Sequence, residues 1–242
     1  MLFELNRDLL FPPVHLAEPD GMLAYGGDLS VDRLLLAYKS GIFPWFNEEN
    51  PIIWWSPNPR FVIFPERVHF SRSMKKILKR GEFEIFVDRD FRRVIRNCAV
   101  VPRGHQKGTW ITDRMRDAYI ILHEEGYAHS FEAWQDGELV GGLYGISLGR
   151  LFFGESMFQH ASNASKAAFL TMTAFVRELG FLVIDSQVYT KHLASLGAEH
   201  ISRDDYLKLV RKGLEYDTIR GSWAGLYSSV TSSRRIFPFD VS

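Results

Sequence analysis

The spacing of apolar and polar residues changes near position 60. From Phe61 onward, short apolar runs bounded by turn residues alternate with segments in which apolar residues recur every three or four positions. The first pattern is typical of strands and the second of amphipathic helices. Before position 60, Pro and Gly interrupt the chain repeatedly, and only residues 30–40 have a helical pattern. The sequence therefore predicts a small, loop-rich N-terminal α/β domain over residues 1–60 and a larger domain over residues 61–242.

The larger domain is predicted to be α+β with a central mixed sheet. Strands are expected at residues 61–64, 83–87, 128–134, 138–147, 150–157 and 181–185. Helices are expected at residues 71–81, 112–125, 163–179, 192–196 and 204–212. The order of helix, antiparallel meander, long helix, strand and short helix resembles that of the GNAT acyltransferase superfamily, which implies a GNAT-like domain. The tail, residues 216–242, shows little periodicity and is expected to cover the surface.

Composition and charge exclude several classes of protein. Hydrophobic residues make up 46% of the chain, and 29 basic residues balance 29 acidic ones, which argues against a disordered chain. No apolar run approaches the roughly 20 residues of a membrane helix, and the N-terminus lacks the order of a signal peptide. Cys98 is the single cysteine, so an internal disulfide is excluded. We expect a cytoplasmic protein that has no membrane partner and acts as a monomer.

Basic residues are concentrated between positions 72 and 80, where the chain has no acidic residue. Ser71 is a good N-cap and Gly81 a good residue after the last turn, so the segment is predicted to be a short helix. Because like charges four residues apart slightly destabilise a helix, such a face indicates phosphate binding, with a solvated face as the alternative. The residues concerned are Arg72, Lys75, Lys76, Lys79 and Arg80. A second basic set, after the expected N-cap Asp88, consists of Arg89, Arg92, Arg93 and Arg96.

Aromatic and polar residues in unusual places suggest a site. Trp45 and Trp110 lie in loops, and exposed indoles near basic helices are typical of stacking on unpaired bases. For either one alone, a core or domain-interface position is the alternative. Glu155 lies inside an apolar strand, so it should meet an amine of a substrate or, alternatively, an arginine of the chain itself. Asp185 and Gln187 follow an apolar strand and share one face, which is where polar site residues often lie.

Together these phrases resemble the leucyl/phenylalanyl-tRNA–protein transferases. The matching segments are residues 19–29, 41–46, 54–57, 71–75, 108–112, 153–158, 163–166 and 185–198. The resemblance implies a small N-terminal domain packed on a GNAT-like C-terminal domain. It implies an enzyme that transfers Leu, also Phe and less so Met, from aminoacyl-tRNA to the N-terminal amino group of proteins beginning with Lys or Arg. The added residue would mark those proteins for degradation.

The resemblance also implies roles for individual residues. Trp45 and Trp110 would hold the terminal adenosine of the tRNA, and the basic helix would bind the tRNA itself. Glu155 would hold the amino group or basic side chain of the acceptor, and Asp185 would remove the amine proton together with Gln187. Proximity alone, with the ribose hydroxyls collecting the proton, is the alternative, and His192 is a weaker candidate base. The expected pocket for the transferred side chain consists of Leu143, Phe152, Phe169, Met172 and Ile184.

The sequence indicates no cofactor and no metal. An aminoacyl ester is already activated, so its aminolysis needs no nucleotide, coenzyme or metal ion. Residues 159–166, where GNAT enzymes carry a glycine-rich loop for the pyrophosphate of coenzyme A, contain no glycine. The eight histidines lack metal-ligand spacing. Three alternatives stay open at this point: a coenzyme A-dependent acyltransferase, a cell-wall aminoacyl-tRNA ligase and an RNA-binding module without activity.

Overall fold

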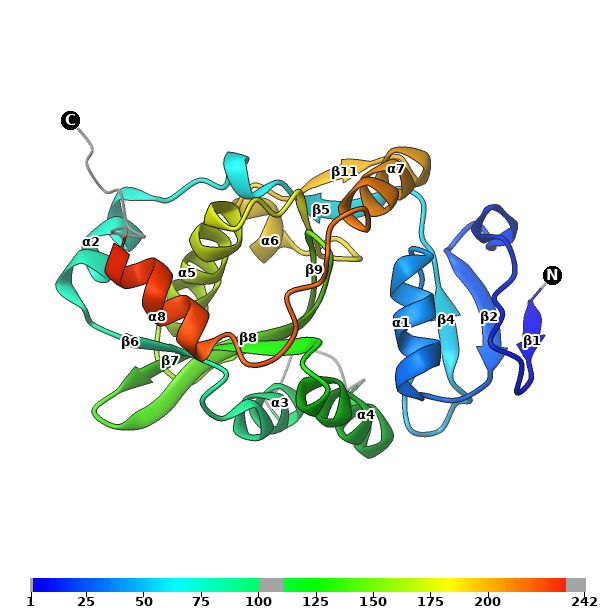
Figure 1. Cartoon of the computed structure of the whole chain (residues 1–242), viewed down its shortest axis with the longest axis horizontal. Helices are drawn as coiled ribbons and strands as arrows, with labels where there is room; N and C mark the ends of the chain where they lie inside the picture. Colours follow the sequence, from blue (N-terminus) through cyan, green and yellow to red (C-terminus); the bar gives the residue numbers. More distant parts are fainter. Residues whose placement is uncertain (1, 101–110, 234–242) are drawn as a thin grey trace.

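The N-terminal part of the chain forms a small four-stranded sheet (Figure 1). The computed structural model describes residues 2–100 and 111–233. The strands lie in the order β1-β2-β4-β3, and β1 pairs in parallel with β2 while the other pairs are antiparallel. Helix α1 (Val31–Lys39) lies on the side of this sheet that faces the rest of the molecule. The strands are β1 (Phe3–Leu5), β2 (Met22–Gly26), β3 (Phe43–Pro44) and β4 (Ile53–Trp55).

The remaining chain is organised around a seven-stranded mixed sheet. Its strand order is β11-β5-β10-β9-β8-β7-β6, and β10 runs parallel to β9 while the other neighbours are antiparallel. The predicted α+β fold, with a small N-terminal domain and a larger domain built on a mixed sheet, is therefore confirmed. The strands are β5 (Arg60–Ile63), β6 (Glu84–Val87), β7 (Ala128–Gln135), β8 (Glu138–Leu148), β9 (Leu151–Gln159), β10 (Val183–Asp185) and β11 (Glu199–Ile201).

Helices cover both faces of the large sheet (Figure 1). The long helix α5 packs on one face, and it is apolar nearly all round because α2 and α8 cover its outer side. Helices α3 and α4 pack on the opposite face, and α4 also contacts α1 of the N-terminal domain. The helices are α2 (Arg72–Arg80), α3 (Phe91–Val100), α4 (Asp113–Glu124), α5 (Ala164–Glu178), α6 (Lys191–Ser195), α7 (Arg203–Gly213) and α8 (Ala224–Ser233), with 3-10 turns at Val14–Leu16 and Pro65–Arg67.

The capping residues identified in the sequence end the helices as expected. The Ser71 hydroxyl accepts a hydrogen bond from the Met74 amide, and Gly81 adopts the left-handed conformation at φ 66°. Thr112 caps α4 in the same way as Ser71 caps α2. The hairpin turn at Asp136 and Gly137 also has positive φ at both residues. Local signals thus fixed most helix and strand positions to within one or two residues.

Asp88 is not the N-cap of α3, contrary to the sequence prediction. Its buried carboxylate contacts the His129 ring at 2.9 Å and accepts hydrogen bonds from the Ser130 and Trp223 amides. Asp90 caps α3 instead, because its carboxylate accepts from the Arg93 amide. The sequence predicts a local cap at Asp88, but the Asp88 carboxylate makes long-range contacts across the sheet instead.

The described part of the tail lies mostly on the surface, as the sequence predicts, but it contains a helix and one buried side chain that the sequence did not predict. Residues 224–233 form α8, and the preceding Trp223 is fully buried. Its indole stacks on His129 with the ring centres 3.8 Å apart and packs against the rings of Phe175 and Phe181. This part of the tail completes the core beneath the large sheet. No helix in residues 2–100 or 111–233 is long and apolar enough to cross a membrane.

Candidate functional site

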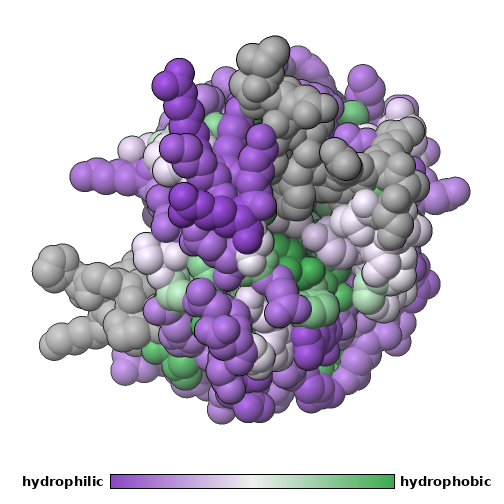
Figure 2. All heavy atoms as spheres, turned by 90° about the vertical axis from the view of Figure 1, so that its left-hand side faces the viewer, coloured by the Kyte–Doolittle hydropathy of each residue, from purple (hydrophilic) through white to green (hydrophobic). Residues whose placement is uncertain are grey.

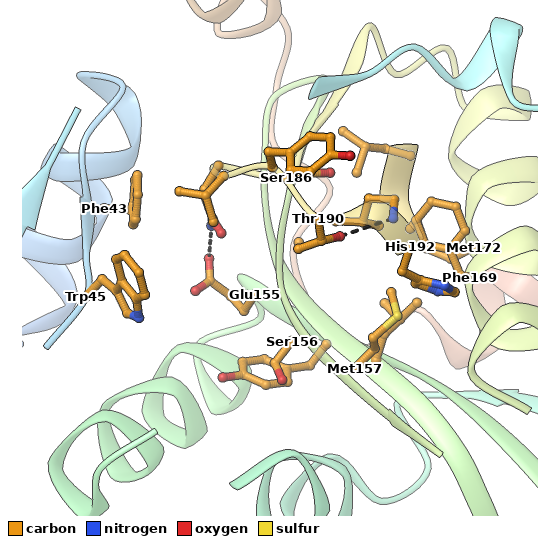
Figure 3. A pocket seen from close by; sticks show the side chains of 18 of the residues that line it. Phe43, Trp45, Glu155, Ser156, Met157, Phe169, Met172, Ser186, Thr190 and His192 are labelled. Carbon is orange, nitrogen blue, oxygen red and sulfur yellow. Dashed lines mark hydrogen bonds between the residues drawn. The ribbon is translucent and has the colours of Figure 1, made fainter. Parts of the chain in front are cut away.

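A cavity of about 680 Å³ opens between the N-terminal domain and the large sheet (Figure 3). It lies where β3, the middle of β8 and β9, helix α5 and the segment after β10 meet. Figure 3 shows Phe43 and Trp45 on one side of Glu155, and Phe169 and Met172 on the opposite side. The cavity is therefore aromatic at the N-terminal domain, polar in the middle and apolar beside α5.

Most of the residues predicted for the site line this cavity. The structure brings together Trp45, Leu143, Glu155, Phe169, Met172, Ile184, Gln187 and the weaker candidate His192. Phe152 does not line it, because its ring packs in the core against Phe131 and Trp223. Asp185 is buried behind the wall, and Trp110 lies outside the described residues.

Trp45 presents an exposed indole at the mouth of the cavity. Its side chain is 37% exposed, although it belongs to a residue type that is usually well buried. The backbone is held in place because the Trp55 indole donates a 2.7 Å hydrogen bond to the Trp45 carbonyl oxygen. The two indoles also pack together, with ring centres 5.7 Å apart. An exposed but anchored indole is suited to stacking on a planar ligand.

Glu155 is the acidic residue of the cavity wall, and its side chain is 9% exposed. Its carboxylate accepts hydrogen bonds from the hydroxyl of Tyr38 at 2.8 Å, the hydroxyl of Tyr119 at 3.0 Å and the side-chain amide of Gln187 at 3.0 Å. None of the described cations forms an ion pair with it. Burial raises the pKa of the Glu155 carboxyl to about 7, although these three hydrogen bonds favour its ionised form. Glu155 can therefore exchange a proton near neutral pH.

Asp185 is in a different environment. The Arg60 guanidinium donates hydrogen bonds to both carboxylate oxygens, from Nε to Oδ1 at 2.9 Å and from Nη2 to Oδ2 at 2.7 Å. The hydroxyl of Tyr206 donates to Oδ2 at 2.7 Å, and both members of the ion pair are 1% exposed. A bidentate, fully buried pair of this kind holds the carboxylate as an anion. Asp185 is thus engaged by an arginine, and it does not face the cavity.

Gln187 connects the two carboxylates. Its backbone amide donates to Asp185 Oδ1 at 2.9 Å, and its side-chain amide donates to Glu155 Oε1 at 3.0 Å. Its φ of 60° is rare for a residue other than glycine and costs conformational energy, which the hydrogen bond from the Gln187 amide to Asp185 helps to offset. Asp185 thereby fixes the backbone from which Gln187 reaches Glu155. The two residues are thus in contact through the backbone of Gln187, and the role expected for Asp185 in removing the amine proton stays a prediction.

His192 closes the apolar end of the cavity beside α5. Burial lowers the pKa of its imidazole, and the nearby Lys166 lowers it further. Figure 3 places His192 with Phe169 and Met172, on the far side of the cavity from Trp45. It is thus a neutral ring in an apolar wall near pH 7 and lies away from Glu155.

Sequence reasoning missed Tyr38, Tyr119 and Arg60. Tyr38 comes from α1 and Tyr119 from α4, and both side chains are fully buried. Arg60 precedes the strand where the second domain was expected to begin. A buried tyrosine in an amphipathic helix looks like any core residue in a sequence. The sequence offered one signal for these residues: an acidic residue inside an apolar strand, Glu155, needs polar partners. It did not indicate which residues those partners are.

The two basic sets have different surroundings. On α2, Arg72, Lys76, Lys79 and Arg80 are exposed and Lys75 is half-buried, and the one ion pair there joins Arg80 to Glu82 at 3.6 Å. Figure 2 faces the end of the molecule where α2 lies and shows hydrophilic side chains over most of that end. The second set is compensated instead, because Arg92 pairs with Glu124 and Arg93 with Glu138. Arg89 lies over the rings of Phe86 and Trp134.

No cluster of three metal-ligating His, Cys, Asp or Glu side chains occurs within the described ranges. The cavity holds one carboxylate and one imidazole at opposite sides, too few ligands for a typical protein metal site.

Comparison with known proteins identifies the family. Residues 62–211 match the family described as leucyl/phenylalanyl-tRNA protein transferase, and residues 27–58 match the N-terminal domain of the same family. The leucyl/phenylalanyl-tRNA–protein transferase of Syntrophus aciditrophicus (strain SB) is 54% identical over 220 residues, which cover 91% of this chain and 92% of that relative. The transferase of Anaeromyxobacter sp. (strain K) is 52% identical over 222 residues, 92% of this chain and 95% of that relative.

Among solved structures, L-PGS from Bacillus licheniformis shows a distant likeness. It is 13% identical, with a TM-score of 0.37 over 88% of this chain and 72% of that chain. The sequence matches, in contrast, extend through both domains and include the residues that surround the cavity. The chain therefore belongs to the leucyl/phenylalanyl-tRNA–protein transferases, enzymes that transfer an amino acid from tRNA to a protein.

Proposed function

We propose that the enzyme transfers Leu, also Phe and less so Met, to the α-amino group of proteins that begin with Lys or Arg, which marks them for degradation. The order of surfaces along the cavity carries this proposal. An exposed indole, a carboxylate with an amide, and an apolar end follow one another between Trp45 and Met172. An aminoacyl-adenosine has the same order of base, reactive ester and side chain.

The apolar end suits an unbranched, branched or benzyl side chain. Leu143, Phe169, Met172 and Ile184 form much of its wall, and Met157 adds a second thioether. Methionine side chains adapt to ligands of different shape, so a wall with two of them favours a small set of apolar donors over a single one. The adenosine would then stack on Trp45, together with Trp110.

Glu155 is assigned to the acceptor amine. An α-amino group has a pKa of about 7.7–8, so it is mostly protonated at neutral pH and must lose a proton before it attacks. A carboxylate whose pKa is about 7 is well matched to take that proton. The neutral nitrogen then attacks the ester carbonyl carbon, the bond from that carbon to the ribose oxygen breaks, and the ribose oxygen receives the proton that the nitrogen gives up. Glu155 passes that proton after the first one, taken from the ammonium group, has gone to the solvent, so each transfer from a protonated amine releases one proton.

Asp185 is assigned to positioning and not to proton abstraction. Its two oxygens are already engaged by Arg60, Tyr206 and the amide of Gln187. A proton on this carboxylate would leave the buried Arg60 guanidinium without its partner, and neither oxygen faces the cavity. Gln187 cannot accept the proton either, but its carboxamide oxygen can accept a hydrogen bond from the amine while its NH₂ group binds Glu155.

The exposed basic face of α2 is assigned to the tRNA. If Lys76 binds a phosphate, Lys76→Glu should weaken tRNA binding and reduce the slope of log affinity against log salt by about one. Lys208→Glu is the matched control, since Lys208 lies on α7 and already pairs with Asp205. Equal effects of the two variants would show that α2 is not a specific tRNA surface.

The proposal is tested by following labelled Leu from leucyl-tRNA into peptides that differ only in their first residue, Arg, Lys or Ala. We expect transfer to the Arg and Lys peptides and little to the Ala peptide. Glu155→Gln should lower the transfer rate by about 10²-fold or more and remove the contribution of a group with a pKa of about 7 to the rise of kcat/KM, leaving the rise set by the amine itself at about 7.7–8, with donor binding retained. Equal use of the three peptides would refute the acceptor assignment. An unchanged pH profile in the variant would refute the role of Glu155.

A further inference from the structure

Two tyrosine hydroxyls converge on Glu155 from different parts of the chain. Tyr38 is in α1 of the N-terminal domain, and Tyr119 is in α4 on the face of the large sheet. The Tyr38 hydroxyl donates to Oε1 of Glu155 and the Tyr119 hydroxyl to Oε2, and the two hydroxyl oxygens also contact each other. Both side chains are fully buried. These contacts join two domains at the carboxylate that faces the cavity.

The hydrogen bonds to Glu155 leave little freedom for its carboxylate. A carboxylate has about four acceptor positions. Oε1 accepts from Tyr38 and Gln187, and Oε2 accepts from Tyr119, so three positions are occupied. One position is therefore left for a donor that enters the cavity. The arrangement fixes both the orientation of the carboxylate and the place where an ammonium group can bind.

We propose that Tyr38 and Tyr119 are positioning residues for the transfer reaction, which act through Glu155 by holding its carboxylate ionised and oriented toward the acceptor amine. This rests on the role proposed above for Glu155. It follows that the N-terminal domain supplies part of the proton-transfer apparatus, and that the site is incomplete without α1.

The hydroxyls of Tyr38 and Tyr119 are among the main groups that favour the ionised form of Glu155, which burial disfavours. From β10, the negative charge of Asp185 disfavours a second anion nearby. The guanidinium of Arg60 pairs with Asp185 and not with Glu155. From β8, Tyr144 packs edge-on against the ring of Tyr119 with ring centres 5.7 Å apart. Only Tyr38, Tyr119 and Gln187 lower the pKa of Glu155 among the principal influences on it.

The test uses the full-length enzyme and the variants Tyr38→Phe and Tyr119→Phe, which remove one hydroxyl and keep the ring. Loss of a hydrogen bond that favours the ionised carboxylate raises its pKa. The rise of kcat/KM with pH should therefore move upward by about one unit in each variant. At pH 6.5 the rate should fall by about tenfold, and at pH 9 it should approach that of the unaltered enzyme. Donor affinity should stay unchanged.

Tyr25→Phe is the matched control. Tyr25 is also in the N-terminal domain and lies beside a carboxylate, but that carboxylate is Glu4. Its variant should keep the original pH profile. Thermal unfolding and donor binding establish for every variant that the fold and the cavity are retained.

The outcomes separate this inference from the proposed function. If Glu155→Gln removes the part of the rise that has a pKa of about 7 but neither tyrosine variant shifts it, the inference is wrong and the role of Glu155 stands. A uniform loss of rate at every pH, without a shift, would also contradict it, because that is the effect of a purely structural contact. If that part of the rise persists in Glu155→Gln, then the role of Glu155 fails and the inference fails with it.

Discussion

Glu155 and Asp185 are two buried carboxylates that share many features but have different partners. Each accepts a hydrogen bond from at least one buried tyrosine, and each binds Gln187, one through its side chain and the other through its backbone. The difference is Arg60. It pairs with Asp185 in a bidentate geometry, whereas none of the described cations pairs with Glu155.

The presence of one guanidinium separates a carboxylate engaged in a buried ion pair from one that faces the cavity without such a pair. Burial would lower the pKa of the Arg60 guanidinium, but Asp185 more than offsets this and the pKa is raised. The pair is therefore fixed as two ions. Burial raises the pKa of Glu155 to about 7, and none of the cations in the described ranges pairs with it, so this side chain changes charge in the pH range where an α-amine does. Glu155 differs from Asp185 because no described arginine or lysine pairs with it.

Replacement of the carboxylate by an amide should have opposite effects on the free energy of unfolding at the two sites. The larger effect is expected at Asp185. Asp185→Asn removes the anion and leaves Arg60 charged and buried without its partner. The free energy of unfolding should fall by about 3–5 kcal/mol. Chemical denaturation at pH 7.5 measures it.

A double-mutant cycle with Arg60→Met provides the control. Because the pair interacts directly, the double variant Arg60→Met with Asp185→Asn should be less destabilised than the sum of the two single variants. A loss below about 1 kcal/mol in Asp185→Asn would mean that the ion pair is not buried as the geometry indicates.

At Glu155 the amide substitution should stabilise the protein at high pH. The carboxyl has a pKa of about 7 in the folded protein and 4.5 as its ordinary value, so between these values the folded state binds the extra proton. Stability is then lost as the pH rises from 4.5 through 7. Glu155→Gln removes this loss and should raise the free energy of unfolding by about 3 kcal/mol at pH 8. At pH 4.5 the difference should be nearly absent.

The pH dependence of the difference is the decisive measurement. Denaturation of both proteins at pH 5, 6.5 and 8 should show a gap that widens with pH. A gap of constant size would be a packing effect, and destabilisation at pH 8 would mean that Glu155 has a cationic partner. Since Gln keeps the shape of the side chain and one acceptor, the hydrogen bonds of Tyr38 and Gln187 can be retained.

The contrast between these carboxylates also shows what the sequence could predict. Both acids stood out because each occurs next to apolar strand residues, and both were assigned to the site. Their partners could not be inferred, since Arg60 lies 125 residues from Asp185 and Tyr38 lies 117 residues from Glu155. Only the folded chain brings such residues together. The alternative of a salt bridge, considered for Glu155 from the sequence, applies to Asp185 instead.

The same distinction between local and long-range information holds for the fold. Ser71 and Gly81 fixed the ends of α2 because capping depends on a few neighbouring residues. The strands of the N-terminal sheet were missed since they have two to five residues and little alternation. Phe152 was expected in the cavity wall, but Trp223 from the distant tail packs against it and places it in the core.

Tyr206→Phe should have the smallest effect on stability, and it distinguishes most clearly between the two carboxylates. Tyr206 donates to Asp185 as Tyr119 donates to Glu155, and both hydroxyls are buried, so the two variants are matched in chemistry. Because Arg60 still holds Asp185 as an anion, Tyr206→Phe should cost only about 0.5–1.5 kcal/mol of stability and should not shift the pH profile of kcat/KM.

Tyr119→Phe should shift the profile upward by about one unit, since no cation among residues 2–100 and 111–233 pairs with Glu155. Parallel pH profiles and unfolding curves of the two variants, recorded in the same buffers, make the comparison direct. An equal shift in both would mean that Asp185 titrates together with Glu155, and the separation of the two carboxylates by Arg60 would have to be abandoned.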